Sequence, residues 1–249
     1  MRLFIAEKPS AAKAIANELG VTGKGDGFIT CGSDKITWCF GHLLELEEPD
    51  AYTPDTVPVS AKTGKKLWRV DELPIIPEKW KVIPKVDARK QLKIIGKLLK
   101  EADEIVNAGD ADREGQLLVD EVLEHFNNSK SVLRFWVAAH DSTSLQRGLK
   151  NNLEYSGLGM AALARSQADW LIGMNLSRAY TLSAARSGAQ NLVPVGRVQT
   201  PTLKLVVDRD REIESFQSKP FFSIKAAFIA QDKVFTGDWE PKEEQEGLD

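Results

Sequence analysis

The chain has 249 residues, of which 42% are hydrophobic and 28% charged, a balance typical of globular proteins. No run approaches the ~18 consecutive apolar residues of a membrane span, and the chain passes from Arg2 directly into a short apolar run, so neither a membrane span nor a secretory signal is expected. The net charge of −3 argues against a general nucleic-acid-binding polycation. Cys31 and Cys39 lack zinc-site spacing and are predicted to be reduced, partly buried thiols, which favours a cytoplasmic location.

Strand and helix patterns alternate from residue 1 to about residue 150, which predicts an α/β fold with a parallel sheet and flanking helices. The predicted strands are residues 2–6, 104–108 and 132–137, together with a hairpin of residues 28–31 and 35–40. The predicted helices are residues 9–19, 88–101 and 115–126. Residues 49–84 contain six prolines and are expected to form an irregular excursion from this core.

The pattern changes in the second half of the chain. Residues 142–187 are predicted to be mainly helical, and a further helix is predicted over residues 200–216. Apolar and polar residues then alternate, which predicts two strands at residues 221–229 and 234–239.

The densest cluster of carboxylates comprises Asp110, Asp112 and Glu114, three acids within five residues. This cluster lies between a predicted strand and a predicted helix, at the carboxyl end of the strand, where open α/β sheets bind ligands. Alternate carboxylates in one turn can converge on a hard divalent cation such as Mg²⁺, which binds one or two carboxylates and keeps several waters. The alternative is that these residues only cap the helix and form the turn.

A second acid, Glu7, follows the predicted strand of residues 2–6. Two strands that end in acids can place Glu7 opposite the Asp110 cluster, where it could bind the metal or transfer a proton. Lys8 adds a positive charge that could hold a phosphate. The alternatives are an acid at the surface end of a strand and a solvated lysine.

Basic residues concentrate in residues 62–100, which contain twelve Lys or Arg and four acids. Such a segment could contact a phosphate backbone. It could equally be the solvated face of an amphipathic helix, because apolar pairs alternate with lysines from Gln91 to Lys100.

Five segments in order along the chain resemble motifs of type IA DNA topoisomerases, in particular the bacterial DNA topoisomerase III group. The segments are Glu7-Lys-Pro-Ser10, Gly41-His-Leu-Leu44, Gly109-Asp-Ala-Asp-Arg-Glu-Gly-Gln116, Ala164-Arg-Ser-Gln-Ala-Asp-Trp-Leu-Ile-Gly173 and Gly196-Arg-Val-Gln-Thr-Pro201. Each motif alone is weak evidence, but five in register over nearly the whole chain are strong evidence.

The resemblance implies a Toprim fold for residues 1–145, with a magnesium site formed by Glu7, Asp110, Asp112 and Glu114. It implies that residues 146–249 begin the topoisomerase core, with a helical part that grips single-stranded DNA up to about residue 216 and then the start of a β arch. In this family a tyrosine attacks a DNA phosphate to give a 5′-phosphotyrosyl link. Another strand then passes through the break, which relaxes or decatenates DNA without ATP.

The resemblance also implies which residues contact DNA. Arg165 and Asp169 are spaced i, i+4 on a predicted helix; the family places Arg165 toward DNA with Asp169 orienting it, and a simple surface ion pair is the alternative. Arg178 is a further, less specific basic candidate on the same helix. Arg197 and Gln199 can donate hydrogen bonds to phosphate. Trp170 is predicted to be a core residue, with base stacking as the alternative.

The sequence departs from the family at the nucleophile. The family's tyrosine lies in a pattern like Ser-Tyr-Pro-Arg-Thr, and none of the chain's tyrosines, Tyr52, Tyr155 and Tyr180, has this context. We therefore expect the chain to be an amino-terminal portion that is inactive alone and monomeric, with single-stranded DNA as its partner. A non-catalytic DNA-binding fragment and a different Toprim enzyme, such as a primase or nuclease, are the alternatives.

Overall fold

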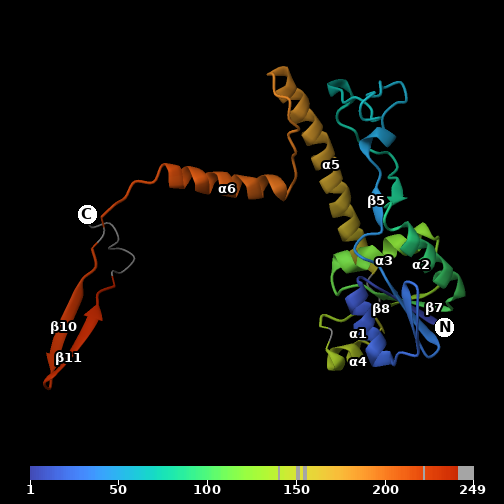
Figure 1. The fold of residues 1–249 in the computed structure, drawn as a ribbon, viewed down its shortest axis with the longest axis horizontal. Helices are drawn as coiled ribbons and strands as arrows, with labels where there is room; N and C mark the ends of the chain where they lie inside the picture. Colours follow the sequence, from blue (N-terminus) through green and yellow to red (C-terminus); the bar gives the residue numbers. More distant parts are fainter. Residues whose placement is uncertain (140, 150–151, 154–155, 221, 241–249) are drawn as a thin grey trace. The chain divides into compact units, whose positions relative to one another are not determined.

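The computed structural model describes residues 1–249 except 140, 150–151, 154–155, 221 and 241–249 (Figure 1). The chain divides into two compact units, Met1–Thr200 and Pro201–Asp249. Among the described residues, none of the helices combines the length and hydrophobicity needed to cross a bilayer.

A seven-stranded sheet forms the centre of the first unit, with the strand order β2-β3-β4-β1-β7-β8-β9. The strands are β1 (Arg2–Ala6), β2 (Gly23–Gly25), β3 (Phe28–Cys31), β4 (Asp34–Trp38), β7 (Glu104–Ala108), β8 (Val132–Phe135) and β9 (Asn152–Leu153). The four central strands, β4, β1, β7 and β8, are parallel, and antiparallel strands flank them. The predicted α/β fold with a parallel sheet is therefore confirmed, as is the hairpin of β3 and β4.

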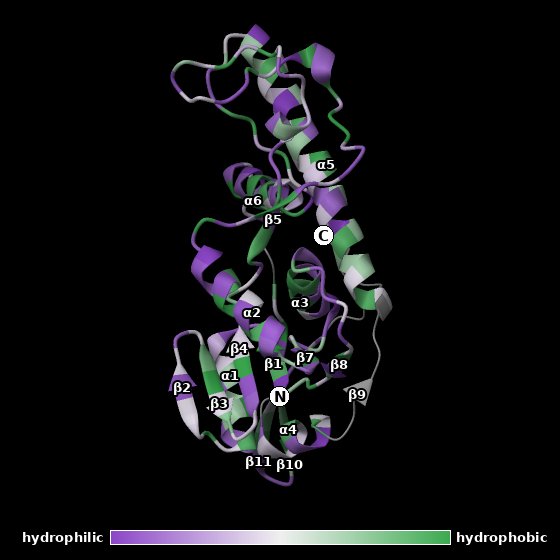
Figure 2. Cartoon of the chain, turned by 90° about the vertical axis from the view of Figure 1, so that its right-hand side faces the viewer, coloured by the Kyte–Doolittle hydropathy of each residue, from purple (hydrophilic) through white to green (hydrophobic). Residues whose placement is uncertain are grey.

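Helices cover both faces of this sheet. They are α1 (Pro9–Leu19) and α4 (Ser142–Gly148) on one face, and α2 (Arg89–Glu101) and α3 (Arg113–His125) on the other (Figures 1 and 2). Successive strand residues point to opposite faces, so Leu3 and Ile5 pack with α2 and α3 while Phe4 packs with α1 and α4. Both layers are needed because a parallel sheet is apolar on both sides.

The Pro-rich excursion is closed at its base by a pair of short strands that the sequence did not predict. These are β5 (Leu44–Leu46) and β6 (Val82–Pro84), which pair antiparallel. Between them the chain is irregular, as predicted, except for the 3₁₀ turns η1 (Pro49–Ala51) and η2 (Val70–Glu72). The long helix α5 (Ser156–Arg186) holds the excursion: Asn175 donates to the Ile75 carbonyl at 2.9 Å and accepts from the Ile75 amide at 2.6 Å.

The predicted helical stretch of residues 142–187 is interrupted. It divides into α4 and α5, and between them β9 pairs antiparallel with β8 and forms the edge of the sheet. Both cysteines, Cys31 and Cys39, are buried free thiols. Beyond α5 come α6 (Gln199–Glu214) and, in the second unit, a hairpin of β10 (Lys225–Ala230) and β11 (Lys233–Asp238), which confirms the last predicted helix and strand pair.

Candidate metal and phosphate site

The acidic loop of residues 109–112 begins where β7 ends, beside the end of β1. These two strands are parallel neighbours with Ala6 opposite Ala108, so the residues that follow them leave the sheet together. Glu7 accepts a hydrogen bond from the Asp110 backbone amide at 3.2 Å. The expectation that two strands place Glu7 opposite the Asp110 cluster is therefore confirmed.

Lys8 supplies a positive charge inside this group of acids. Its ammonium lies 2.6 Å from Oδ2 of Asp110. The hydrogen bond to Asp110 raises the pKa of Lys8 above its usual value, with smaller contributions from the charges of Glu7 and Asp112. Lys8 is thus a protonated group whose partner in this structure is a carboxylate.

Two glycines allow the acidic loop to pack against the start of α3. A Cβ on Gly109 would lie 2.0 Å from the carbonyl oxygen of Gly115, and a Cβ on Gly115 would lie 2.4 Å from the carbonyl oxygen of Asp110. Both contacts are far shorter than van der Waals separation and involve backbone, which cannot swing aside. Glycine is therefore required at both positions for the backbone to approach this closely.

Asp112 is the N-cap of α3. Its side chain accepts a hydrogen bond from the Gly115 amide at 2.7 Å, and its extended backbone is typical of a capping residue. The capping interpretation considered from the sequence therefore applies to Asp112, and α3 begins two residues earlier than predicted. One of the two carboxylate oxygens remains outside this hydrogen bond.

Arg134 holds the acidic loop by hydrogen bonds to its backbone, a role that the sequence did not predict. This residue of β8 is only 3% exposed. Its Nη1 donates to the carbonyl oxygens of Asn107 at 3.1 Å and Gly109 at 2.8 Å, and its Nη2 donates to that of Asp110 at 2.6 Å. A guanidinium with several fixed donors can hold three carbonyl groups of one short stretch of backbone in this way.

A second buried network supports the loop from the side of α3. Asn107 accepts from the Gly109 amide at 3.0 Å and donates to Asp120 at 3.2 Å. Gln116 also donates to Asp120 at 2.9 Å, so it buttresses the turn. Burial raises the pKa of Asp120, because the charged carboxylate loses solvation there. Polar side chains on both sides of the acidic loop in the sequence, Asn107 before it and Gln116 and Asp120 after it, thus fix its shape.

Glu114, in the first turn of α3, faces α5. Its carboxylate lies 3.7 Å from Nη1 of Arg165, and Arg165 lies 3.9 Å from Asp169. Asp169 also forms a hydrogen-bonded ion pair with Arg197, which lowers the pKa of Asp169 and raises that of Arg197. A row of alternating charges therefore runs from the first turn of α3, through α5, to the segment that precedes α6.

That segment is fastened to α5 by hydroxyl groups. Ser177 accepts from the Val195 amide at 2.9 Å, and Thr181 accepts from the Val193 amide at 3.0 Å. Arg197 and Gln199 follow directly and are exposed. The predicted DNA-binding residues Arg165, Asp169, Arg197 and Gln199 are thus accessible on a surface that adjoins Glu114, which we call the Arg165 surface.

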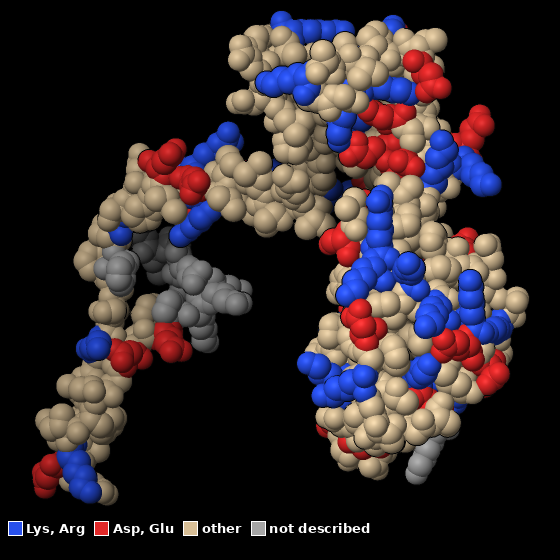
Figure 3. Space-filling view, turned by 45° about the vertical axis from the view of Figure 1, so that its right-hand side comes forward, with Lys and Arg blue, Asp and Glu red and all other residues tan. Residues whose placement is uncertain are grey.

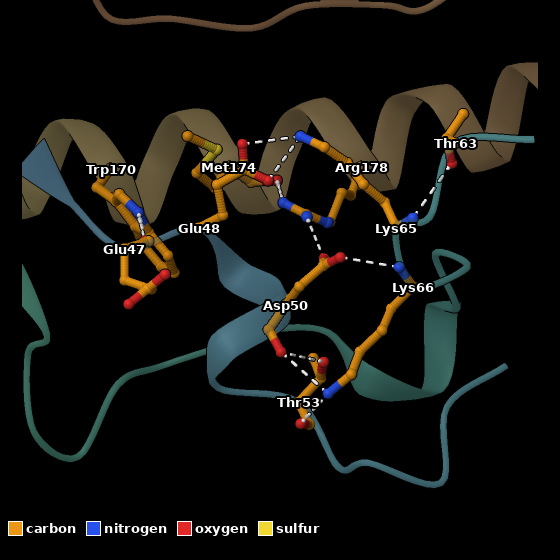
Figure 4. Close-up of polar contacts among 10 residues, drawn as sticks. All are labelled: Glu47, Glu48, Asp50, Thr53, Thr63, Lys65, Lys66, Trp170, Met174 and Arg178. Carbon is orange, nitrogen blue, oxygen red and sulfur yellow. Dashed lines mark hydrogen bonds and ion pairs between the residues drawn. The ribbon is translucent and has the colours of Figure 1, made fainter. Parts of the chain in front are cut away.

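Arg178, the remaining basic candidate, is buried against the excursion (Figure 4). It is 7% exposed, lies 3.4 Å from Asp50, and stacks over the ring of Trp68 at 4.7 Å. Burial lowers the pKa of Arg178. Trp170, 6% exposed, donates to the carbonyl oxygen of Glu47 at 3.0 Å, which confirms the prediction that it is a core residue.

The chemistry of the acidic loop fits a hard divalent cation. Glu7, Asp110 and Asp112 offer carboxylate oxygens, and Oδ1 of Asp110 is buried without a hydrogen-bond partner among the described residues. In the described part of the chain, however, no three acidic, histidine or cysteine side chains are grouped so as to hold a metal ion. A cation would therefore bind to one or two carboxylates and complete its shell with water or phosphate, as Mg²⁺ does.

Comparison with known proteins identifies the family. A model of the Toprim domain matches residues 2–139, more than half of the chain, and a model described as DNA topoisomerase matches residues 154–248. Proteins named DNA topoisomerase 3 are 46% identical in Haemophilus influenzae and 49% identical in Pasteurella multocida, over 97% and 93% of this chain. These alignments span 39% and 36% of the relatives, so the chain covers less than two fifths of their length.

A solved structure supports the fold. Full-length topoisomerase I from Thermotoga maritima matches 90% of this chain and 32% of its own, with a TM-score of 0.55 and 22% sequence identity. Topoisomerases with a Toprim domain generally use a metal ion and bind single-stranded DNA. The two family models and the relatives cover the same residues that carry the acidic loop and the Arg165 surface, and the chain therefore belongs to the type IA DNA topoisomerases of the topoisomerase III kind.

Proposed function

We propose that this chain provides the metal-binding and DNA-gripping part of a type IA DNA topoisomerase, an isomerase that relaxes and decatenates DNA by single-strand passage without ATP. Residues 1–145 would form the Toprim catalytic domain, and residues 146–249 would begin the core that grips DNA and the β arch. The observation that carries the proposal is the meeting of Glu7 and Asp110 at the ends of two parallel strands, with Lys8 between them.

The acids of this site would hold Mg²⁺. The candidate ligands are Glu7, Asp110, Asp112 and Glu114, of which the ion would contact one or two directly and the others through water. The unpartnered buried oxygen of Asp110 supports this assignment. When bound, the ion supplies positive charge that binds and polarises a DNA phosphate. Lys8 holds the phosphate to be cleaved as a point charge, and Glu7 holds or accepts the proton of the 3′-oxygen.

The row of charges beside the acidic loop would bind the DNA backbone. Arg165 and Arg197 donate to phosphates, Asp169 fixes both guanidinium groups, and Gln199 adds a neutral donor. Arg178 is buried beside Asp50, so it would reach a phosphate only if this contact were broken. Such contacts give little sequence preference, since phosphates are the same at every base.

None of the three tyrosines in this sequence lies in the nucleophile pattern of the family, so a different segment would supply the nucleophile. The Tyr52 hydroxyl accepts a hydrogen bond from the Lys81 amide at 2.9 Å, and its ring packs edge-on against Trp170 at 5.6 Å, so Tyr52 has a structural role. Tyr180 is exposed but lacks the family context, and Tyr155 lies outside the described residues. These contexts favour the second candidate function, single-strand binding without catalysis, for the 249 residues alone. We further propose that the protein is a monomer, that it acts in the cytoplasm, and that it needs no nucleotide triphosphate.

Fluorescence anisotropy with a labelled single-stranded oligonucleotide tests the DNA surface. We expect Arg165→Ala with Arg197→Ala to weaken binding and to reduce the slope of log K against log salt by about 1.4, because each phosphate contact with a single strand contributes about 0.7. A matched control, Arg147→Ala with Arg186→Ala, removes two exposed arginines elsewhere and should bind like the parent.

Equal affinity and slope for the Arg165 and Arg197 variant and the parent would refute the proposed surface.

The parent mixed with the same labelled oligonucleotide should give no covalent adduct on a denaturing gel. An adduct would show that one of its own side chains acts as the nucleophile.

A further inference from the structure

Helix α2 presents a surface made almost entirely of positive charge. Between Arg89 and Lys100 the exposed positions are all basic, and every other position is buried or half-buried. These exposed residues are Arg89, Lys90, Lys93, Lys97 and Lys100. Lys90 to Lys100 spans about 15 Å along the helix axis at 1.5 Å per residue. We call these five residues the α2 basic stripe. Figure 3 draws the Lys and Arg side chains of the described residues in blue.

The opposite side of α2 fixes the orientation of the stripe. Leu92, Ile95 and Leu98 are buried in the core below the sheet residues. Gln91, the inward polar residue, donates to the Trp38 carbonyl at 2.8 Å and to the Thr37 hydroxyl at 3.0 Å. The helix therefore cannot rotate to hide its lysines without breaking apolar packing and buried hydrogen bonds.

Two acids near the stripe pair with residues outside it: Glu101 with Lys35 at 2.7 Å, and Asp103 with the terminal amine of Met1. Asp26 lies 2.9 Å from Lys90, and Asp87, just before α2, forms no ion pair with a stripe residue in the described part of the chain. The other four stripe residues have no hydrogen bond or ion pair with another residue in the described part of the chain. The stripe thus keeps most of its charge although the chain as a whole is negative.

Charges arranged in this way disfavour the isolated helix. Lys93 and Lys97 are spaced i, i+4, and Lys97 and Lys100 are spaced i, i+3, so like charges face one another at a cost of about 0.2–0.5 kcal/mol per pair. The usual arrangement on a solvated helix face mixes acids and bases and avoids this cost. A polyanionic partner would convert the repulsion into attraction.

We infer that the α2 basic stripe is a second DNA-binding surface, which contacts the phosphate backbone of duplex DNA next to the single strand held by the Arg165 surface. Duplex DNA suits it better than a single strand, because single-strand sites use aromatic side chains to stack bases and the stripe exposes only Lys and Arg. Binding a duplex backbone requires cations alone. This surface is separate from the acidic loop and does not depend on its metal.

The test compares duplex and single-stranded DNA binding by the 249-residue chain across a salt series. The variant Lys93→Gln, Lys97→Gln, Lys100→Gln removes three charges and keeps good helix formers at exposed positions. We expect duplex affinity to fall about tenfold or more at low salt, and the slope of log K against log salt to fall by about three. Single-strand affinity should change much less.

A matched control separates the stripe from overall charge. Lys13→Gln, Lys24→Gln, Lys62→Gln removes the same charge from exposed lysines outside α2 and should bind duplex like the parent. The inference is overturned if the stripe variant keeps the parent's duplex affinity and slope, if both triple variants lose duplex binding equally, or if single-strand binding falls as much as duplex binding. Binding of polyglutamate in place of duplex DNA would assign the stripe to an acidic protein segment and would overturn it as well.

Discussion

Helices α2 and α3 pack against the same face of the sheet, yet their polar side chains serve opposite purposes. On α3, Asp112, Gln116 and Asp120 are bound to backbone or to each other and fix the acidic loop. On α2 the exposed residues form a row of cations, most of them without partners among the described residues. The polar groups of α3 therefore hold the acidic loop in place, whereas the charges of α2 remain available to a binding partner.

The framework of the acidic loop, which includes Arg134 of β8, and the α2 stripe should differ strongly in their contribution to stability. Arg134→Met should lower the free energy of unfolding by about 3 kcal/mol, because three carbonyl oxygens of the acidic loop would lose their buried donor. The α2 variant Lys97→Met should change it by less than about 0.5 kcal/mol, since it alters an exposed residue. Urea unfolding followed by circular dichroism measures both values.

Similar values for the two variants would break the contrast between a buried framework and a free surface. Arg134→Lys sharpens it: one ammonium keeps the charge but cannot reproduce the fork of donors, so this variant should also be clearly destabilised.

A smaller expected effect is that the contact between His42 and α3 makes a contribution to stability that depends on pH. Glu121 of α3 lies 2.9 Å from Nδ1 of His42, and this hydrogen bond raises the pKa of His42 above its usual value near 6.5. A raised folded pKa gives stability that is fully present below the unfolded pKa and is lost as pH rises through the folded pKa. His42→Gln should therefore lower the melting temperature more at about pH 6 than at about pH 8.

The control for this pH effect is His125→Gln, which removes a histidine that has no acidic partner among the described residues. A loss for His42→Gln that is the same at both pH values would show that packing, rather than the charge of His42, connects β5 to α3.

The sequence predicted the parts of the site that depend on chain order. The strands before Glu7 and Asp110 were recognisable from their apolar runs, and parallel pairing then brought the two acids together. The parts that depend on backbone partners were not predictable. Arg134 is a single charged residue within a strand, and nothing in its neighbours along the sequence reveals that carbonyl oxygens from another strand surround it.

The sequence also could not predict which charged residues are buried. Arg178 has the same helical context as Arg165 in the sequence, but only the folded excursion, whose base is closed by β5 and β6, places Asp50 and Trp68 against it. The pattern of Gln91 to Lys100 allowed both a solvated face and a phosphate-binding face. The pairing of the neighbouring acids with other residues distinguishes these alternatives, and it depends on tertiary contacts.

The central claim is that the acidic loop between β7 and α3 holds a divalent cation. Isothermal titration with Mg²⁺ tests it in the parent, in Asp110→Asn, and in the control Asp26→Asn, which alters the acid that borders the α2 stripe. We predict saturable heat for the parent and the control, and its loss in Asp110→Asn, because Asp110 carries the buried oxygen without a partner. Equal heats from the parent and Asp110→Asn would contradict the claim.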